Sequence, residues 1–272
     1  MVLFTKVKKD DLKILLDHGF YLDHAKKYES IRYKGPCTVI LFDSGKLLIQ
    51  GRDEAVAAVR KIIEDAKIAV LIPEIRFNEY HGTYIGSDEC MKGDTFGGIV
   101  VAGLKANDRE RQELKQLGVV DSKKLKDEEI IIIADQIKNK FKNVVYSLTP
   151  KQYNSKTKNK SITELLNELH EMVFTELSPG KHVVDKYPGC KVGDISEVRA
   201  EEKYVEVAAA SILARASCLE QFEMLSRKAG FKIPKGSTHV ENAVIGIRKS
   251  NLPLEEFLKL NFKNVDKFLI NA

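Results

Sequence analysis

The chain has 272 residues and a formal net charge of +5, and 43% of its residues are hydrophobic. This length and composition predict one large or two smaller globular domains, and no apolar run approaches the length of a membrane span. The four cysteines are scattered without a CxxC pair, which argues against a zinc cluster and a disulfide framework. The first residues lack a secretory signal, so we expect a cytoplasmic protein, and the positive charge weakly favours a polyanionic partner.

Residues 1–68 have the pattern of a small separate module. Acids in the first turn and Gly19 after the last turn predict a short helix over residues 10–18. Three β-rich segments separated by turns predict an antiparallel meander, and they cover residues 30–34, 37–42 and 46–50. Apolar spacing predicts a closing helix over residues 53–66. We expect a linker over residues 69–79 and a larger domain over residues 80–272.

Basic residues of this small sheet are candidates for binding nucleic acid. Alternation along the strands could place Arg32, Lys34 and Lys46 together on one solvent face. Such a face could hold phosphates and sugars. An ordinary solvated sheet surface explains the same residues, because Lys and Arg are mostly exposed.

Two adjacent acids, Asp88 and Glu89, end a predicted strand over residues 84–87, and a glycine-rich turn separates them from a return strand over residues 99–102. Successive strand side chains point to opposite faces, so the two acids cannot both be buried in one core without a compensating charge. A divalent cation is the natural compensation, and Gly93 would let the backbone come close to a ligand. Exposed turn acids are the alternative.

The segment Asp121-Ser122-Lys123-Lys124 predicts a helix start. Asp121 or Ser122 could cap a helix that continues through residues 130–141. A helix N-terminus with free backbone N–H groups, a hydroxyl and two lysines suits a phosphate. A capped helix with its lysines in water remains the simpler alternative.

Strands and helices alternate in the remaining chain. Residues 143–148 predict a strand, and the basic residues 151–160 predict a mobile loop near a polyanion. Ser161 and Glu164 form a capping box for a helix on whose surface we expect His170, without a ligand role.

Asp185 ends a β-rich segment just as Asp88 and Glu89 do, and Glu201 lies near the start of a helix. The small residues 208–211 let that helix pack very close to a sheet. We expect helices around residues 242–249 and 254–260 to be peripheral.

Several motifs occur in one order along residues 80–250. They are Ile85-Gly86-Ser87-Asp88-Glu89 with Gly93-Asp94 and Phe96-Gly97, then Asp121-Ser122-Lys123-Lys124-Leu125, Val184-Asp185, Arg199-Ala200-Glu201-Glu202-Lys203-Tyr204 and residues 208–214. In residues and order, these motifs together resemble the type 2 ribonucleases H, and within them the ribonuclease HIII branch.

The resemblance implies an α/β protein whose RNase H-like catalytic domain has a central mixed sheet flanked by helices. It also implies a small N-terminal α+β domain, similar to one repeat of the TATA-binding protein, that holds the substrate. The implied activity is endonucleolytic hydrolysis of the RNA strand of RNA/DNA hybrids, leaving 5′-phosphate and 3′-hydroxyl ends. We expect a monomer with no obligate protein partner.

Four acidic ligands for two Mg2+ or Mn2+ ions fall, by the same resemblance, on Asp88, Glu89, Asp185 and Glu201. Asp88 is the expected bridging ligand. Ribonuclease HII relatives mostly carry aspartate at the fourth place, where this chain has glutamate, so the neighbouring Glu202 is a rival for that role.

The expected phosphate contacts are Lys92, Ser122, Lys123 and Lys124, with Gly93, Tyr153 and Asn154 as further substrate contacts. Met91-Lys92-Gly93 stands where ribonuclease HII has Gly-Arg-Gly. We therefore expect weak or no cleavage at single embedded ribonucleotides. The turn also differs from the Gly-x-Gly usual in ribonuclease HIII, although Gly93 keeps its place.

Two other functions stay open at this point. A hybrid-binding protein without catalysis could keep the fold, although clustered acids beside phosphates give a pure binder no advantage. Another metal-dependent nuclease of the same broad fold could act on DNA. Product analysis on hybrid and on duplex DNA separates these possibilities.

Overall fold

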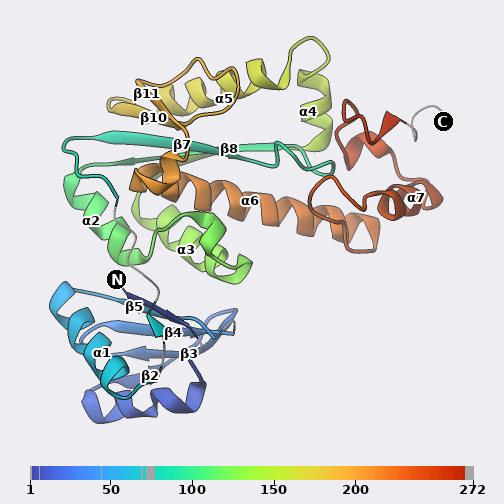
Figure 1. Ribbon diagram of the computed structural model, residues 1–272. Helices are drawn as coiled ribbons and strands as arrows, with labels where there is room; N and C mark the ends of the chain where they lie inside the picture. Colours follow the sequence, from blue (N-terminus) through green and yellow to red (C-terminus); the bar gives the residue numbers. More distant parts are fainter. Residues whose placement is uncertain (1, 6, 44, 69, 72–76, 267–272) are drawn as a thin grey trace.

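The computed structural model describes residues 2–5, 7–43, 45–68, 70–71 and 77–266, and its strands form two separate sheets (Figure 1). The N-terminal sheet is antiparallel, with the strand order β2-β3-β4-β5-β1-β6. Its strands are β1 (Val2–Thr5), β2 (Tyr21–Asp23), β3 (Glu29–Lys34), β4 (Thr38–Phe42), β5 (Leu47–Gln50) and β6 (Val70–Leu71). The predicted meander is confirmed, and β6 adds residues 70 and 71 to this sheet, where we expected linker.

Two helical segments pack on one face of the N-terminal sheet. They are the 3-10 helix η1 (Lys9–His18) and the helix α1 (Asp53–Asp65), as predicted. Val39 and Leu41 of β4 point into the core that these helices complete. Ile40 and Phe42 point to the opposite face, as strand alternation requires.

The second sheet has the order β11-β10-β7-β8-β9 and is mixed. Its strands β7, β8 and β9 are antiparallel neighbours, whereas β10 runs parallel to β7 and β11 parallel to β10. The strands are β7 (Tyr84–Cys90), β8 (Ile99–Ala106), β9 (Lys142–Leu148), β10 (Lys181–Asp185) and β11 (Ile195–Glu197).

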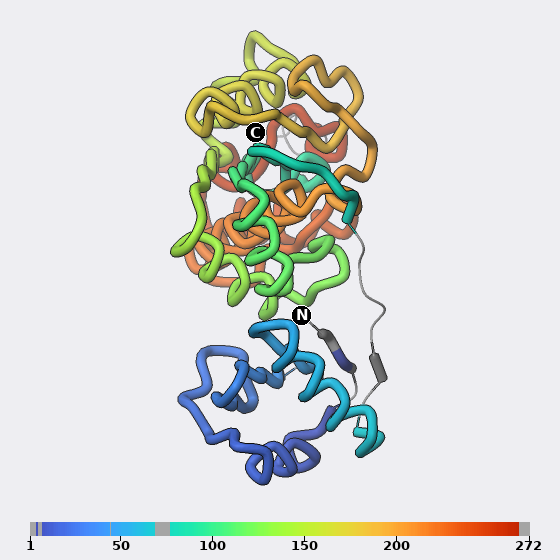
Figure 2. The backbone as a smooth tube through the Cα atoms, turned by 90° about the vertical axis from the view of Figure 1, so that its left-hand side faces the viewer, coloured from blue at the N-terminus to red at the C-terminus, as the bar shows by residue number. Residues whose placement is uncertain are grey.

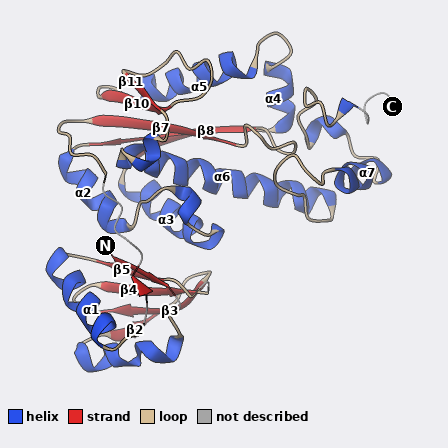
Figure 3. Cartoon of the chain, in the orientation of Figure 1, coloured by secondary structure: helices blue, strands red, loops and turns tan. Residues whose placement is uncertain are grey.

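Helices cover both faces of this second sheet (Figures 1 and 3). One face carries α5 (Ile162–Leu177), and the other carries α6 (Val205–Ala229), with α2 (Asp108–Leu117) and α3 (Asp127–Lys140) packed beyond it. The expected mixed sheet flanked by helices is confirmed. In the part of the chain that is described, no helix is long and apolar enough to cross a membrane.

Small side chains allow α6 to pack unusually close to β7. A Cβ atom on Gly86 would lie 2.3 Å from the backbone nitrogen of Val207, far inside van der Waals contact. Ala208, Ala209 and Ala210 of α6 are fully buried. This close packing lays the first turns of α6 along β7, with Glu206 and Val207 against Gly86 and Ser211 near Asp88.

Three local predictions are wrong. Residues 122–141 do not form one helix, because Asp121 caps only the 3-10 turn η2 (Ser122–Lys124) by accepting a hydrogen bond from Lys123 N, and α3 starts later. Residues 150–156 form the helix α4 (Pro150–Lys156), opened by a capping box of Thr149 with Gln152, where a mobile loop was expected. Of the two helices expected after α6, α7 (Glu241–Lys249) forms as predicted, whereas residues 254–260 hold only the short 3-10 helix η4 (Leu254–Glu256).

The C-terminal segment is not peripheral. Lys259 is fully buried, and its Nζ donates to the carbonyl oxygens of Met91 at 2.8 Å and Asp94 at 2.5 Å. Its backbone N–H donates to Thr95 O at 2.9 Å. The residues around Lys259 therefore hold the turn that follows Glu89.

The two sheets belong to parts that contact each other (Figure 2). Ile40, Phe42 and Leu48 of the N-terminal sheet pack against Ile132 of α3. Beside them, Gln50 Nε2 donates to Leu117 O at 2.6 Å. The face of the N-terminal sheet that is not covered by η1 and α1 thus lies against α2 and α3.

Candidate active site

Asp88, Asp185 and Glu201 come together where β7, β10 and η3 (Ala200–Glu202) meet. In the parallel pairing of β10 with β7, Val184 lies level with Ser87, so the next residue of each strand is an aspartate. Asp185 Oδ1 accepts a hydrogen bond from Ala200 N at 2.9 Å, which fixes η3 beside β10. The fold therefore brings Asp88 together with two acids that lie about a hundred residues later in the chain.

Burial and mutual repulsion dominate the electrostatics of these acids. Burial, together with the nearby charges of Glu89 and Asp185, holds the pKa of Asp88 well above its usual range. Burial and the charges of Glu201 and Glu89 raise the pKa of Asp185 to about 6, although the Ala200 N–H acts in the opposite direction. The four predicted acids are thus electrostatic neighbours.

Asp88 and Glu89 leave β7 on opposite faces. Asp88 points toward the α6 side, and its Oδ1 accepts a hydrogen bond from Glu89 N at 2.8 Å. Glu89 points toward the α5 side, where its Oε1 lies 3.7 Å from Lys92 Nζ and its Oε2 lies 3.5 Å from His170 Nε2. The expected placement of the two acids on opposite faces is confirmed.

Glu201 is buried near Asp185, whereas Glu202 is exposed. Only 2% of the Glu201 side chain is accessible, and Lys123 Nζ donates to its Oε1 at 2.6 Å. Burial opposes ionisation of Glu201, but the hydrogen bond from Lys123 lowers its pKa below the ordinary value. The geometry therefore favours Glu201 over Glu202.

The turn after Glu89 carries two of the predicted substrate contacts, Lys92 and Gly93. Met91 adopts a positive φ of 72° and is buried, and Lys92 Nζ lies 4.9 Å from the centre of the Tyr187 ring. A Cβ on Gly93 would meet no atom within 4 Å, so the backbone there is open to a ligand. Lys92 and Gly93 thus lie at the edge of the acid cluster.

The predicted phosphate seat at residues 122–124 is only partly assembled. Ser122 is buried, and its Oγ lies 2.6 Å from Ser211 Oγ of α6, the helix that also faces Asp88. Lys123 reaches Glu201, as described above. Lys124 is exposed, and its carbonyl oxygen accepts a hydrogen bond from Lys46 Nζ at 2.8 Å.

Tyr153 and Asn154 lie in α4 and are bonded within the protein. Tyr153 is buried, with its hydroxyl 3.4 Å from Asn261 Oδ1. Asn154 Nδ2 donates to Leu258 O, and its Oδ1 accepts from Leu260 N, both at 2.9 Å. Their contact with substrate stays a prediction, and the structure shows them holding the C-terminal segment.

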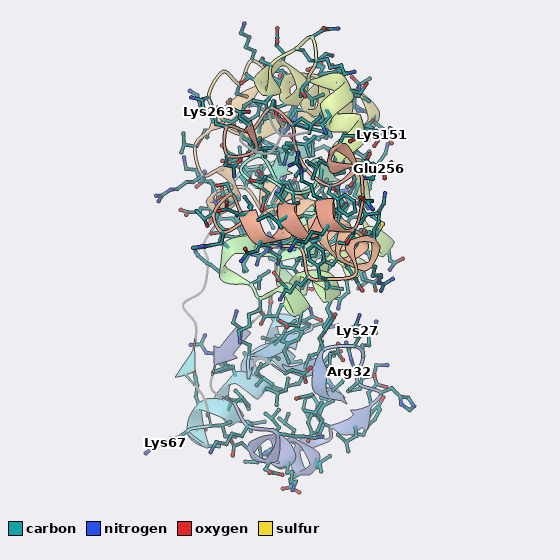
Figure 4. The ribbon with its side chains drawn as sticks, turned by 90° about the vertical axis from the view of Figure 1, so that its right-hand side faces the viewer. Lys27, Arg32, Lys67, Lys151, Glu256 and Lys263 are labelled. Carbon is teal, nitrogen blue, oxygen red and sulfur yellow. The ribbon has the colours of Figure 1, made fainter. Side chains whose placement is uncertain are left out.

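Arg32, Lys34 and Lys46 do not form a common solvent face. Arg32, labelled in the N-terminal part in Figure 4, is buried and forms an ion pair with Glu29. Lys34 pairs with Asp23 at 3.2 Å. Lys46 Nζ lies 2.9 Å from Glu129 Oε2 of α3 and so joins the two parts of the molecule. The expectation of a shared solvated basic face is wrong, because that face packs on α2 and α3.

The histidines behind Glu89 were not predicted. His170 is fully buried on α5 and not on the helix surface, and its Nδ1 lies 2.7 Å from Ser87 Oγ. The sequence carried a signal for this position, since His170 is four residues after the buried Leu166 and three before the buried Val173, on the same helix face.

Comparisons with known proteins agree with this arrangement. The family model described as Ribonuclease HII matches residues 85–265. Ribonuclease HIII of Bacillus velezensis is 34% identical over 268 aligned residues, covering 85% of this chain and 84% of the relative. Ribonuclease HIII of Bacillus subtilis is 35% identical over 266 aligned residues, with the same coverage.

A solved structure resembles the whole molecule. The crystal structure of Bst-RNase HIII in complex with Mn2+ matches with a TM-score of 0.63 and 28% identity, covering 100% of this chain and 99% of that one. The match therefore includes the small N-terminal sheet as well as the larger domain. On the family match, the relatives and this structure, the chain belongs to the ribonuclease HIII branch of the type 2 ribonuclease H family and is a ribonuclease H enzyme.

Proposed function

We propose that the enzyme hydrolyses the RNA strand of RNA/DNA hybrids with two divalent cations, Mg2+ or Mn2+, and leaves 5′-phosphate and 3′-hydroxyl ends. The observation that carries the proposal is the gathering of Asp88, Glu89, Asp185 and Glu201 around the ends of β7 and β10. Buried acids that repel one another make a protein less stable unless a cation offsets their charge.

The donor set fits hard divalent cations. Within the described residues, no three His, Cys, Asp or Glu side chains already converge as a finished metal site. Glu201 Oε2, however, is buried and has no hydrogen-bond partner, while Oε1 of the same carboxylate holds Lys123. Carboxylate oxygens of this kind are the ligands that Mg2+ and Mn2+ prefer.

Each acid has a distinct place in the proposed site. Asp88 is next to Glu89 in the chain and, one residue beyond the pair of Ser87 with Val184, near Asp185, which suits a ligand shared by both cations. When bound, the cations would supply Lewis-acid stabilisation and an activated water. The protein contributes fixed oxygen ligands at the ends of rigid elements.

Lysines on two sides of the acid cluster are positioned to bind phosphates of the substrate. Lys92 lies beside Glu89 and Lys123 beside Glu201, and an ammonium group so placed can bind a phosphodiester oxygen. Gly93 leaves its backbone open to close approach by a nucleotide. Met91 replaces the first glycine of the turn, so we propose weak or no cleavage at single embedded ribonucleotides.

The experiment that tests this function is cleavage of an end-labelled RNA/DNA hybrid with Mg2+ or Mn2+. Wild type is compared with Asp88→Asn, Glu201→Gln and Glu202→Gln. We expect cuts in the RNA strand that are lost with Asp88→Asn and Glu201→Gln and kept with Glu202→Gln. Loss with Glu202→Gln alone would reassign the fourth ligand.

Two further substrates separate the alternatives. Duplex DNA should remain intact, and a DNA duplex with one embedded ribonucleotide should be cut far more slowly than the hybrid. Cleavage of duplex DNA at a similar rate would point to a DNA nuclease of this fold. No metal-dependent cutting of the hybrid would overturn the proposal.

A further inference from the structure

Three polar side chains form a buried chain behind Glu89. Ser87 and His170 are fully buried, and His182 is 1% exposed. Ser87 Oγ lies 2.7 Å from His170 Nδ1 and 2.8 Å from His182 Nε2. The serine of β7 therefore bridges one histidine of α5 and one of β10, in a layer that is otherwise apolar.

Aromatic rings hold both imidazoles in place. The Phe174 ring stacks on His182 with centroids 5.0 Å apart and an interplanar angle of 3°, and Tyr187 stacks on His170 at 5.3 Å. Stacked rings in a packed core cannot turn freely. The ring nitrogen of His170 that does not face Ser87 is therefore directed at Glu89, with Nε2 at 3.5 Å from Glu89 Oε2.

Hydrogen bonding between Ser87, His170 and His182 decides which ring nitrogen of each histidine carries the proton. A neutral imidazole has one N–H and one acceptor nitrogen, and a serine hydroxyl has one proton to donate. If His182 Nε2–H donates to Ser87 and Ser87 donates to His170 Nδ1, then His170 carries its proton on Nε2. That proton then faces Glu89 Oε2, a buried acceptor with no hydrogen-bond partner of its own.

The opposite direction is less favourable at both ends. It would put a proton on His182 Nδ1, which is buried and has no hydrogen-bond partner in the described residues. It would also turn a lone pair of His170 Nε2 toward the carboxylate of Glu89, which repels it. A buried donor without an acceptor costs about 1 to 3 kcal/mol. A doubly protonated His170 does not help. Ser87 then either donates to His182 and leaves the same orphaned donor, or accepts from both histidines and leaves its own O–H without an acceptor.

We propose that His170 is a positioning residue for Glu89, held in the Nε2–H tautomer by Ser87 and His182. The proposal rests on the proposed role of Glu89 as a metal ligand. His170 restrains Oε2 from the α5 side, so Oε1, which lies 3.7 Å from Lys92 Nζ, is the oxygen that would bind a cation. Removing a side chain that holds a metal ligand in place typically lowers metal affinity or activity 10- to 100-fold.

The first test reads the tautomers in the metal-free wild-type protein by long-range 1H–15N NMR of the histidine rings. We expect protonated Nε2 and bare Nδ1 on both His170 and His182. A proton on His182 Nδ1 would reverse the chain and overturn the proposal. This reading does not depend on any activity of the enzyme.

The second test compares His170→Asn with His170→Gln. Asparagine can still meet Ser87 but is too short to reach Glu89, whereas glutamine places its amide near the position of Nε2. We expect His170→Asn to bind Mn2+ about 10- to 100-fold more weakly by calorimetry, and His170→Gln to recover most of that loss. Matched thermal unfolding checks that both variants fold.

The control is His81→Asn, because the His81 side chain is 94% exposed and lies outside the cluster. It should bind Mn2+ as the wild type does. If wild type binds Mn2+ and cuts the hybrid while His170→Asn behaves like wild type, the positioning role falls and the proposed function stands. If wild type neither binds Mn2+ nor cuts, the proposed function itself has failed.

Discussion

Asp88 is buried in a position where its negative charge is electrostatically unfavourable. Its carboxylate is buried and faces Glu89 and Asp185, so its charged form is disfavoured without a cation. In EDTA, Asp88→Asn should therefore raise the free energy of unfolding, by on the order of 1 kcal/mol. The same variant should lose most of the stabilisation that Mn2+ gives the wild type.

Thermal unfolding with EDTA and with Mn2+ measures both effects. Asp10→Asn is the control, because the Asp10 side chain is 84% exposed and should change stability by less than about 0.5 kcal/mol. A less stable Asp88→Asn protein in EDTA would contradict the expectation.

Lys259 is a second buried charge, and burial lowers its pKa to about 8 while the charge of Asp94 acts against that shift. A lysine in the unfolded chain titrates near 10.4, so between about pH 8 and about pH 10 the unfolded state binds more protons. Stability from this group therefore rises with pH across that window. Lys259→Met lacks this contribution.

Urea unfolding at about pH 7 and about pH 10 checks the prediction for Lys259. The difference in unfolding free energy, wild type minus Lys259→Met, should increase with pH by up to roughly 3 kcal/mol. A difference that stays constant or shrinks would show that Lys259 keeps its proton throughout.

For single residues, the sequence predicts the acids of the candidate site better than the buried side chains that hold the site in place. Asp88, Glu89 and Asp185 stand at strand ends next to turn residues, a local pattern that can be recognised in the chain. Lys259 could not be found in this way, because its partners are carbonyl oxygens more than 160 residues away. Hydrogen bonds to backbone atoms leave no trace in side-chain patterns.

At the scale of elements, the contact between β7 and α6 depends on Gly86. A methyl group there would overlap the backbone of Glu206 and Val207. Gly86→Ala should lower the free energy of unfolding by about 1 to 3 kcal/mol and reduce activity, because β7 must shift with Asp88 and Glu89 on it.

Gly93→Ala is the matched control for stability, since a Cβ at Gly93 would meet nothing within 4 Å. It should change the unfolding free energy by no more than about 0.5 kcal/mol. Equal losses in the two variants would indicate that glycine flexibility, and not the approach of α6, explains the effect at Gly86.

Several strands and helices followed from local patterns, whereas the helix α4 did not. The capping box at Ser161 opens α5 as expected. Residues 151–160 are basic and polar, which concealed a helix that buries only Pro150 and Tyr153. A helix with so small a buried face has almost no apolar period to detect.

At the scale of the whole molecule, Lys46 links the N-terminal sheet to α3. Glu129 is fully buried, so removing its cation leaves a charge without its partner. Lys46→Met should therefore loosen the contact between the two parts. We expect faster hydrogen exchange in α3 and a larger radius of gyration by X-ray scattering.

The control for Lys46 is Lys34→Met on the same sheet, since Lys34 is half exposed and pairs with Asp23. It should leave both measurements unchanged. The double variant Lys46→Met with Glu129→Gln should restore part of the contact, because no buried charge remains. A compact Lys46→Met protein would show that the apolar contact of Ile132 is sufficient.

The covered face of the N-terminal sheet was missed for a physical reason. We expected solvent there because Arg32, Lys34 and Lys46 alternate with apolar residues. The run Val39-Ile40-Leu41-Phe42 is apolar on both faces, however, which is typical of a strand buried on both sides. That run was the available signal for a partner surface.

The parallel register between β7 and β10 has a consequence for how this chain can vary in length. Val184 lies level with Ser87, and this pairing alone brings Asp185 beside Asp88. One residue inserted into either strand would turn its acid to the other face of the sheet. Insertions in the connections between these strands leave the register intact, so length can change there without dismantling the acid cluster.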